Sequence, residues 1–213
     1  MITTLSKEEE KAILIDGPAG KLEVVLAEPI GKDRGVLGIV CHPHPLFGGT
    51  MDNKVVTTLV KTFQHLGVVA IRFNFRGVGK SEGKFDHANG EVDDLLAVMD
   101  WLRKGQAYQE VWLAGFSFGA YIAAKAATLF PVKKLITIAP PVQHFPMHEL
   151  LPITCPWILV QGEQDDVVPA EEVYAWVKTR DPQPEVLRFP HAGHFFHGQL
   201  TELRRRLEEV LGA

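Results

Sequence analysis

The sequence predicts an α/β domain with a mostly parallel, doubly wound sheet of about eight strands. Short apolar runs rich in β-branched residues alternate with segments whose apolar residues recur at the 3.6-residue period of a helix. Repeated succession of strand, loop and helix is typical of a parallel sheet with helices on both faces. The 213 residues are a usual length for one such domain, so we expect a single domain over residues 1–213.

Eight segments are predicted to be strands. The first two, 11–16 and 21–27, flank the turn sequence Gly-Pro-Ala-Gly and predict an antiparallel hairpin at a sheet edge. The other six are apolar runs assigned to the parallel part of the sheet: 36–41, 68–74, 111–114, 134–139, 156–161 and 185–190.

The segments between these strands are predicted to be helices. Apolar stripes at helical spacing begin at Val55 and at Val92. The segment that starts at Ala120 is apolar on nearly all sides, so it should be strongly buried, and Pro131 should end it. Pro169 is expected in the first turn of a further helix. The last predicted helix has an apolar side made of Leu200, Leu203, Leu207 and Val210.

Composition excludes some partners and compartments. The chain has 22 basic and 26 acidic residues, a net charge of −4, and no long run of one sign, which argues against nucleic acid or an anionic membrane as the main partner. Cys41 and Cys155 lie in apolar segments, where buried thiols suit a reducing compartment. The first ten residues do not resemble a leader, and no apolar run is long enough to cross a bilayer, so a cytoplasmic location is expected.

Residues 111–120, Val-Trp-Leu-Ala-Gly-Phe-Ser-Phe-Gly-Ala, carry the strongest functional signal. A predicted strand runs into Gly115-x-Ser117-x-Gly119 and then into a predicted helix, a turn so tight that both glycine positions require the absence of a side chain. The serine hydroxyl is thereby pushed out above the sheet at a helix N-terminus. Such residues could simply connect a strand to a helix, but the flanking elements favour Ser117 as a nucleophile.

A serine hydroxyl needs a base to take its proton and a third group to orient that base. Both are expected on later loops at the carboxyl ends of the strands. The loop after the last predicted strand offers three histidines. We favour His194, because it follows Gly193 and precedes two aromatic residues that could exclude water, whereas His191 and His197 are expected at the surface or the pocket rim.

The acid is expected in the turn that follows strand 156–161. Asp165 and Asp166 lie there side by side, and either carboxylate could reach the histidine. A solvated acidic turn is the alternative interpretation, but the chain order Ser, Asp, His is the one that this type of fold uses.

An oxyanion hole requires two N–H groups aimed at the developing charge. One should be the backbone N–H of Phe118, and the other should come from the loop His-Pro-His-Pro-Leu-Phe-Gly-Gly-Thr at residues 42–50. Because proline has no N–H, the early donors in that loop are His44 and Leu46. We expect His44 to be the donor, with Leu46 as the alternative, and His42 to be a core or rim group.

We expect neither a metal nor another cofactor. The spacing of the three histidines in residues 191–197 could suggest zinc, but Gly193 interrupts a helical face. No Cys or Glu is spaced to complete a ligand set.

These motifs resemble those of the α/β-hydrolase superfamily over nearly the whole chain. More narrowly, the stretches that begin at His42 (HPHPLFGGTMDNKVV), Arg72 (RFNFRGVGKSEG) and Gly193 (GHFFHG) are similar to small bacterial hydrolases related to dienelactone hydrolase and short-chain acylesterases. The resemblance implies that the acid is the third residue after the strand-ending Gly162, which is Asp165. It also implies that only residues 140–154 occupy the place of a lid, so little or no lid and an open site are expected.

The expected function is therefore that of a serine hydrolase that cleaves carboxylic esters or thioesters of a small-molecule acyl substrate through an acyl-enzyme on Ser117. Amide or peptide cleavage and perhydrolysis by the same three residues are alternatives, as is a non-catalytic ligand-binding member of the fold. The sequence leaves monomer and homodimer equally open. Candidate walls of an apolar acyl pocket are Phe47, Phe75, Phe118, Phe145, Met147, Phe195 and Phe196.

Overall fold

The computed structural model describes residues 10–105 and 110–212. Residues 1–9, which include nearly all of the N-terminal stretch that does not resemble a leader, lie outside the described residues. Eight strands form one sheet in the order β1-β2-β4-β3-β5-β6-β7-β8. Their bounds are β1 Glu10–Gly17, β2 Gly20–Ala27, β3 Val36–Cys41, β4 Val69–Phe73, β5 Glu110–Phe116, β6 Lys134–Ile138, β7 Trp157–Gly162 and β8 Glu185–Phe189.

The sheet is mostly parallel, as predicted. β1 pairs with β2 as an antiparallel hairpin at one edge, and β2 is also antiparallel to its other neighbour, β4. All remaining pairs, from β4–β3 across to β7–β8, are parallel. The carboxyl ends of β3, β5, β7 and β8 therefore meet at one edge of the sheet, which brings the four loops with predicted site residues together.

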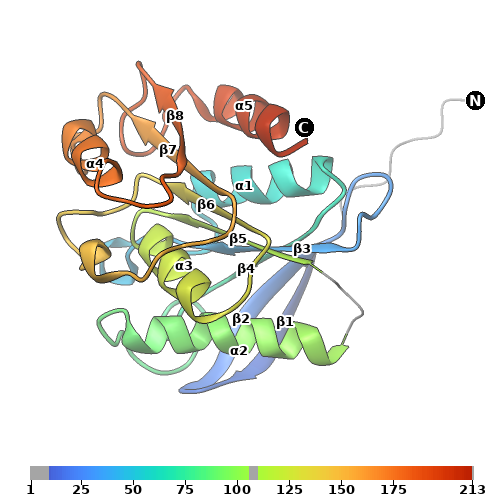
Figure 1. The fold of residues 1–213 in the computed structure, drawn as a ribbon. Coiled ribbons are helices and arrows are strands. Elements are labelled where there is room, and N and C mark those ends of the chain that lie inside the picture. Colours follow the sequence, from blue (N-terminus) through green and yellow to red (C-terminus); the bar gives the residue numbers. More distant parts are fainter. Residues whose placement is uncertain (1–9, 106–109, 213) are drawn as a thin grey trace, which may run out of the picture.

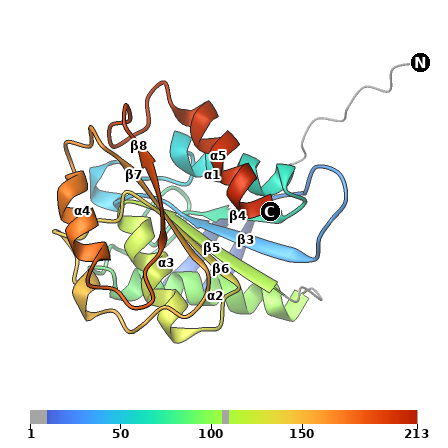
Figure 2. The same cartoon turned by 45° about the horizontal axis from the view of Figure 1, so that its top comes forward.

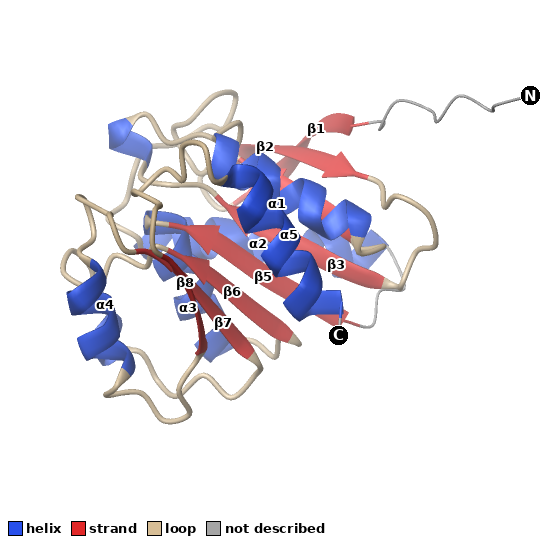
Figure 3. Ribbon diagram, turned by 90° about the horizontal axis from the view of Figure 1, so that it is seen from above, coloured by secondary structure: helices blue, strands red, loops and turns tan. Residues whose placement is uncertain are grey.

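Helices cover both faces of the sheet (Figure 1). Two of them, α1 and α5, pack side by side on one face, and α2, α3 and α4 cover the other (Figures 1 and 2). The view from above shows α1 and α5 lying over the strands (Figure 3). The bounds are α1 Lys54–His65, α2 Asn89–Gly105, α3 Phe118–Leu129, α4 Ala170–Val177 and α5 Leu200–Gly212.

The core has two layers, one on each face of the sheet. Alternate residues of a strand belong to different layers: Val69 and Ile71 of β4 pack toward α2 and α3, while Ala70 between them packs toward α1. A strand buried on both faces needs apolar residues at every position, which explains the continuous apolar runs in the sequence.

The predicted element boundaries hold within a few residues. β5 is longer than the predicted 111–114, and α4 begins at Ala170, so Pro169 is the residue that precedes the helix rather than part of its first turn. Two short 3-10 turns, η1 (Pro45–Phe47) and η2 (Met147–Glu149), lie in segments that the sequence predicts as loops. Within residues 10–105 and 110–212, no helix has both the length and the apolar character needed to cross a membrane.

Candidate active site

Ser117 lies between β5 and α3 in a strained turn. Its φ of 53° and ψ of −119° fall in a region that residues with side chains rarely adopt. A Cβ on Gly115 would overlap the carbonyl oxygen of Gly119, and a Cβ on Gly119 would overlap the carbonyl oxygen of Cys41. The two glycines therefore allow the turn to be this tight, as the sequence predicts, and the turn presents the Ser117 side chain at the N-terminus of α3.

His194 lies beside Ser117 although 77 positions separate them in the chain. Its Nε2 is 3.2 Å from the Ser117 Oγ. The imidazole is buried, with the ring of Phe116 at 5.0 Å and the ring of Phe195 at 5.1 Å between centroids. Phe195 thus shields this side of the imidazole from water, whereas Phe196 packs away from it, against Phe189 in the core.

Asp165 completes a chain of hydrogen bonds with these two residues. The Nδ1–H of His194 donates to the Asp165 Oδ2 across 2.8 Å. The second carboxylate oxygen, Oδ1, accepts the backbone N–H groups of Val167 at 2.9 Å and Val168 at 2.7 Å. Asp165 is buried and Asp166 is exposed, so the structure brings Ser117, His194 and Asp165 together and leaves Asp166 outside.

Gln161 is a site residue that sequence reasoning missed. This buried side chain, at the end of β7, donates from Nε2 to the Asp165 Oδ2 at 3.2 Å and to the Val168 carbonyl oxygen at 3.0 Å. It thereby closes the turn around the carboxylate. The signal was present in the sequence, because a polar amide interrupts an otherwise apolar run, and buried polar groups require partners.

Two residues beside Ser117 have backbone N–H groups that are available to an oxyanion. Within the described parts of the chain, no hydrogen bond uses the N–H of Phe118, the first residue of α3, or that of His44. Both residues line the same cavity as Ser117. The alternative donor, the N–H of Leu46, is already donated to the Nδ1 of His44 at 3.2 Å. The geometry thus leaves the His44 N–H available and the Leu46 N–H occupied.

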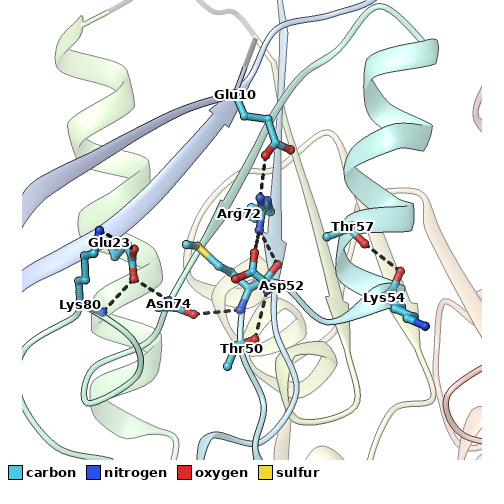
Figure 4. A network of polar contacts seen from close by, with 10 residues as sticks. Glu10, Glu23, Thr50, Asp52, Lys54, Thr57, Arg72, Asn74 and Lys80 are labelled. Carbon is cyan, nitrogen blue, oxygen red and sulfur yellow. Dashed lines mark hydrogen bonds and ion pairs between the residues drawn. The ribbon is translucent and has the colours of Figure 1, made fainter. Parts of the chain in front are cut away.

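The segment that follows the His44 loop is anchored by Arg72 of β4 and by Asn74, the residue directly after β4. The side-chain Oδ1 of Asn74 accepts the N–H of Met51 at 2.9 Å, and Arg72 donates to the Met51 carbonyl oxygen at 3.1 Å (Figure 4). Arg72 also contacts the carboxylates of Asp52 and Glu10 (Figure 4). These polar contacts hold residues 51–52, which connect η1 to α1, against the sheet.

A cavity of about 620 Å³ opens above Ser117 and His194. Four of the seven predicted wall residues line it, namely Phe47, Phe118, Phe145 and Phe195. The other three, Phe75, Met147 and Phe196, are buried in the core. Lining residues that the sequence did not single out are Gly48, Gly49, Asn53, Pro141, His144, Val167 and Val168, together with Pro43.

Three other features surround this cavity or concern what it could bind. His191 and His197 are exposed, in line with a surface position. Among residues 10–105 and 110–212, no three His, Cys, Asp or Glu side chains cluster in a way that could hold a metal ion. The segment between β6 and β7 contains only the short turn η2, and its Phe145 contributes one wall of the cavity.

Comparisons with known proteins agree with this architecture. The family model described as X-Pro dipeptidyl-peptidase (S15 family) matches residues 16–149, a range that includes His44 and Ser117 and ends before Asp165 and His194. An uncharacterised protein of Rickettsia prowazekii is 34% identical over 209 residues, covering 93% of this chain and 87% of the relative.

Two solved bacterial structures are more similar. An α/β serine hydrolase homologue from Coxiella burnetii is 49% identical, with a TM-score of 0.93 and coverage of 98% of this chain and 100% of that one. A Xanthomonas campestris protein, described as an α/β serine hydrolase without a lid, is 42% identical, with a TM-score of 0.91 and coverage of 97% and 95%. The chain therefore belongs to the α/β serine hydrolases without a lid, in the S15 family.

Proposed function

We propose that this protein hydrolyses carboxylic esters or thioesters of small, apolar acyl groups through an acyl-enzyme on Ser117. The observation that carries the proposal is the continuous hydrogen-bond chain from the Ser117 Oγ through both nitrogens of His194 to the buried carboxylate of Asp165. A base that contacts the hydroxyl, with an acid that fixes its orientation, is the arrangement that makes a serine nucleophilic near neutral pH.

The first half of the proposed reaction forms the acyl-enzyme. The Ser117 Oγ attacks the substrate carbonyl carbon while its proton passes to the Nε2 of His194. The resulting imidazolium is stabilised by Asp165, which accepts its Nδ1–H at 2.8 Å. The negative oxygen of the tetrahedral intermediate accepts the N–H groups of Phe118 and His44. As the carbonyl reforms, His194 returns the proton to the leaving alcohol or thiol.

The second half releases the acid. Water gives a proton to the His194 Nε2 and attacks the acyl carbon, and the same two N–H groups hold the second tetrahedral intermediate. Collapse of this intermediate breaks the bond to the Ser117 Oγ, which recovers its proton from His194. The products of one turnover are a carboxylic acid and an alcohol or thiol, and the three side chains return to their starting protonation states.

The cavity lining favours uncharged acyl groups. Among the described residues that line it, none is Asp, Glu, Lys or Arg, and four phenylalanines with two valines supply most of the wall. A charged substrate group would lose its hydration here without gaining a partner of opposite charge. A short to medium acyl chain gains from the same surface, at about 25 cal/mol for each Å² of apolar area removed from water.

A second candidate follows from the description of the family model, which names X-Pro dipeptidyl-peptidases. The substrate of such a reaction carries an N-terminal ammonium group two residues from the cleaved bond. The described lining of the cavity offers no carboxylate to receive that ammonium, and Asp165 is buried behind His194. We therefore place ester and thioester cleavage ahead of dipeptide release.

One panel of substrates on purified protein tests these assignments. We expect turnover of p-nitrophenyl acetate, butyrate and hexanoate and of an acyl thioester, little cleavage of Ala-Pro-p-nitroanilide, and labelling of Ser117 by a fluorophosphonate. Ser117→Ala should abolish labelling and turnover. Faster cleavage of Ala-Pro-p-nitroanilide than of every ester would favour the peptidase. Absence of both turnover and labelling, with ligand binding retained in Ser117→Ala, would indicate a binding protein.

We also propose that the protein acts in a reducing compartment such as the cytoplasm. Both cysteines are free thiols, with Cys41 buried at the end of β3 and Cys155 half-buried before β7. Burial raises the pKa of the Cys41 thiol far above its ordinary value, which keeps this sulfur protonated and chemically inert.

A further inference from the structure

His42 is a fully buried histidine to which the proposed reaction gives no role. It follows the last residue of β3 and precedes the loop that carries His44. Both ring nitrogens have partners: Nδ1 lies 2.6 Å from the carbonyl oxygen of Pro43, and Nε2 lies 3.1 Å from the backbone nitrogen of Phe75. The Phe75 ring packs on the imidazole at 4.6 Å between centroids.

The two partners determine where the proton of His42 is carried. The Phe75 N–H can only donate, so Nε2 must be the unprotonated acceptor. The Pro43 carbonyl can only accept, so Nδ1 must carry the hydrogen and donate it. A doubly protonated ring would set a second N–H against the N–H of Phe75. Burial favours the neutral form as well, because it lowers the pKa of His42 to about 4.

The Phe75 side of this contact is firmly held. The next residue, Arg76, donates its backbone N–H to the Asp94 Oδ2 at 2.9 Å, and its guanidinium donates to the same buried carboxylate from Nε and from Nη2, the latter at 2.8 Å. Asp94 belongs to α2, so residues 75–76 are fixed to a helix of the core. The position of the His42 imidazole is consequently set by groups that do not depend on the loop it contacts.

The Pro43 carbonyl and the His44 N–H belong to the same peptide unit. This peptide bond is trans, so its C=O and N–H point in opposite directions within one plane. A hydrogen bond that fixes the carbonyl oxygen therefore also fixes the direction of the N–H. The carbonyl of His44 is held too, since it accepts the N–H groups of Phe47 at 3.1 Å and Gly49 at 3.0 Å.

We infer that His42 is a positioning residue of the oxyanion hole, whose Nδ1–H holds the Pro43 carbonyl and thereby aims the His44 N–H at the oxyanion above Ser117. The inference rests on the proposed function, because it presumes that the His44 N–H receives that charge. Preorganised donors need no reorientation during the reaction, which is why their fixed direction contributes to the rate. His42 acts through a peptide unit, and its ring nitrogens bond to neither the nucleophile nor its base.

Two amide substitutions separate this role from a merely structural one. In His42→Asn, the side-chain amide nitrogen can occupy the place of Nδ1 and keep the donor for Pro43, while the acceptor for Phe75 is lost. In His42→Gln, the amide oxygen can occupy the place of Nε2 and keep the acceptor for Phe75, while the donor for Pro43 is lost. Each variant loses one of two buried hydrogen bonds, so the two proteins are matched controls for stability.

The kinetic expectation is a difference between the two variants. With p-nitrophenyl butyrate, His42→Gln should lower kcat by about 10- to 100-fold with little change in KM, because a misdirected donor weakens only the transition-state interaction. His42→Asn should retain at least about tenfold more kcat than His42→Gln. Thermal unfolding of both variants provides the stability comparison. Equal losses of kcat in the two, or a larger loss in His42→Asn, would overturn the inference.

A second measurement needs no enzymatic activity. The ¹⁵N chemical shifts of the imidazole nitrogens in the unsubstituted protein at pH 7 report which nitrogen of His42 carries the hydrogen. The inference requires the Nδ1–H form, and an Nε2–H form would refute it even if both variants failed to fold. Failure of the proposed function would be recognised separately, as absence of ester turnover and of Ser117 labelling in the unsubstituted protein.

Discussion

The carboxylate of Asp165 accepts the Nδ1–H of His194 at 2.8 Å inside the protein, while the next residue along the chain, Asp166, lies in solvent. Two backbone N–H groups, from Val167 and Val168, draw the Asp165 side chain inward. Adjacent residues in a turn point in different directions, so only one of the two carboxylates can take this place.

The pair of aspartates provides the first prediction. Every donor around Asp165 approaches a carboxylate oxygen, so Asp165→Asn must place an amide N–H against another N–H. We expect kcat to fall by about 10³- to 10⁴-fold, because His194 loses the partner that orients it and stabilises its charge. Asp166→Asn should leave kcat within about twofold. Steady-state kinetics on both variants decides the matter, and a larger loss in Asp166→Asn would remove Asp165 from the proposed mechanism.

Strain at Ser117 provides the second prediction. Both Ser117→Ala and Ser117→Gly remove the nucleophile, but only glycine adopts a φ of 53° with a ψ of −119° without strain. We expect Ser117→Gly to be more stable than Ser117→Ala by about 1–2 kcal/mol. Such backbone strain costs of order 1–3 kcal/mol, and the larger conformational entropy of glycine in the unfolded chain offsets part of the relief. Urea unfolding of the two inactive proteins measures the difference. If alanine were the more stable of the two, the turn would not be strained in solution.

The exposed ring of Phe47 provides the third prediction. This side chain is 87% exposed and lines the cavity from η1. We expect Phe47→Ala to raise KM for p-nitrophenyl hexanoate about three- to tenfold and to leave KM for the acetate unchanged, because only the longer chain reaches the lost apolar surface. Leu14→Ala is the matched control, since Leu14 is 53% exposed on β1, outside the cavity. The same rise in Leu14→Ala, or none in Phe47→Ala, would contradict this placement of the acyl chain.

The buried imidazole of His42 provides the fourth prediction, which concerns how the free energy of unfolding changes with pH. Its pKa is lowered from 6.5 to about 4 in the folded protein, first by burial, so between these pH values the unfolded chain binds the extra proton. Stability from this group is complete above about pH 6.5 and is lost as the pH falls toward 4, with a slope that approaches about 1.4 kcal/mol per pH unit.

Urea unfolding between pH 5 and 8, compared with His42→Asn, isolates this contribution, because every other ionisable group is present in both proteins. The pKa of His44 is also lowered, first by burial and then by His87. This residue is present in both proteins, so its effect on stability has the same sign in each. We expect the difference in free energy of unfolding between the two proteins to shrink as the pH falls below 6.5. A difference that stayed constant over this range would show that His42 titrates normally in the folded state.

The sheet and the nucleophile turn could be predicted because their causes are local. Apolar runs, and apolar residues that recur every 3.6 positions, indicate which sides of each element face the core. They predicted the bounds of the strands and helices within a few residues. The turn at Ser117 follows from steric contacts between residues only four apart, Gly115 and Gly119, so its sequence nearly specifies its shape. Where the motif follows a parallel strand, its place at the carboxyl edge of the sheet also follows.

Other features of the site depend on contacts between distant residues, which leave no periodic trace in the sequence. Four of seven candidate phenylalanine and methionine walls reach the cavity, and nothing in their local sequence separates Phe145, which does, from Phe75, which packs on His42. Gln161 was missed for a different reason: its partners Asp165 and Val168 are only four and seven positions away, and its role follows from how the turn after β7 folds back over its side chain.

By itself, the sequence determined the fold class, the strained turn at Ser117 and the chain order of the three residues, because these follow from short-range sterics and burial patterns. Only the tertiary structure decided that Asp165 rather than Asp166 faces His194, that the Leu46 N–H is occupied while that of His44 is available, and that His42 links the loop to Phe75. Each of these features depends on the direction in which a side chain or an N–H group points within a loop. The Asp165–His194 and Phe75–His42 hydrogen bonds join residues 29 and 33 positions apart. The Leu46–His44 bond is local, but the His44 ring that accepts it packs against the distant rings of Phe85 and Phe118. These directions therefore exist only in the folded protein.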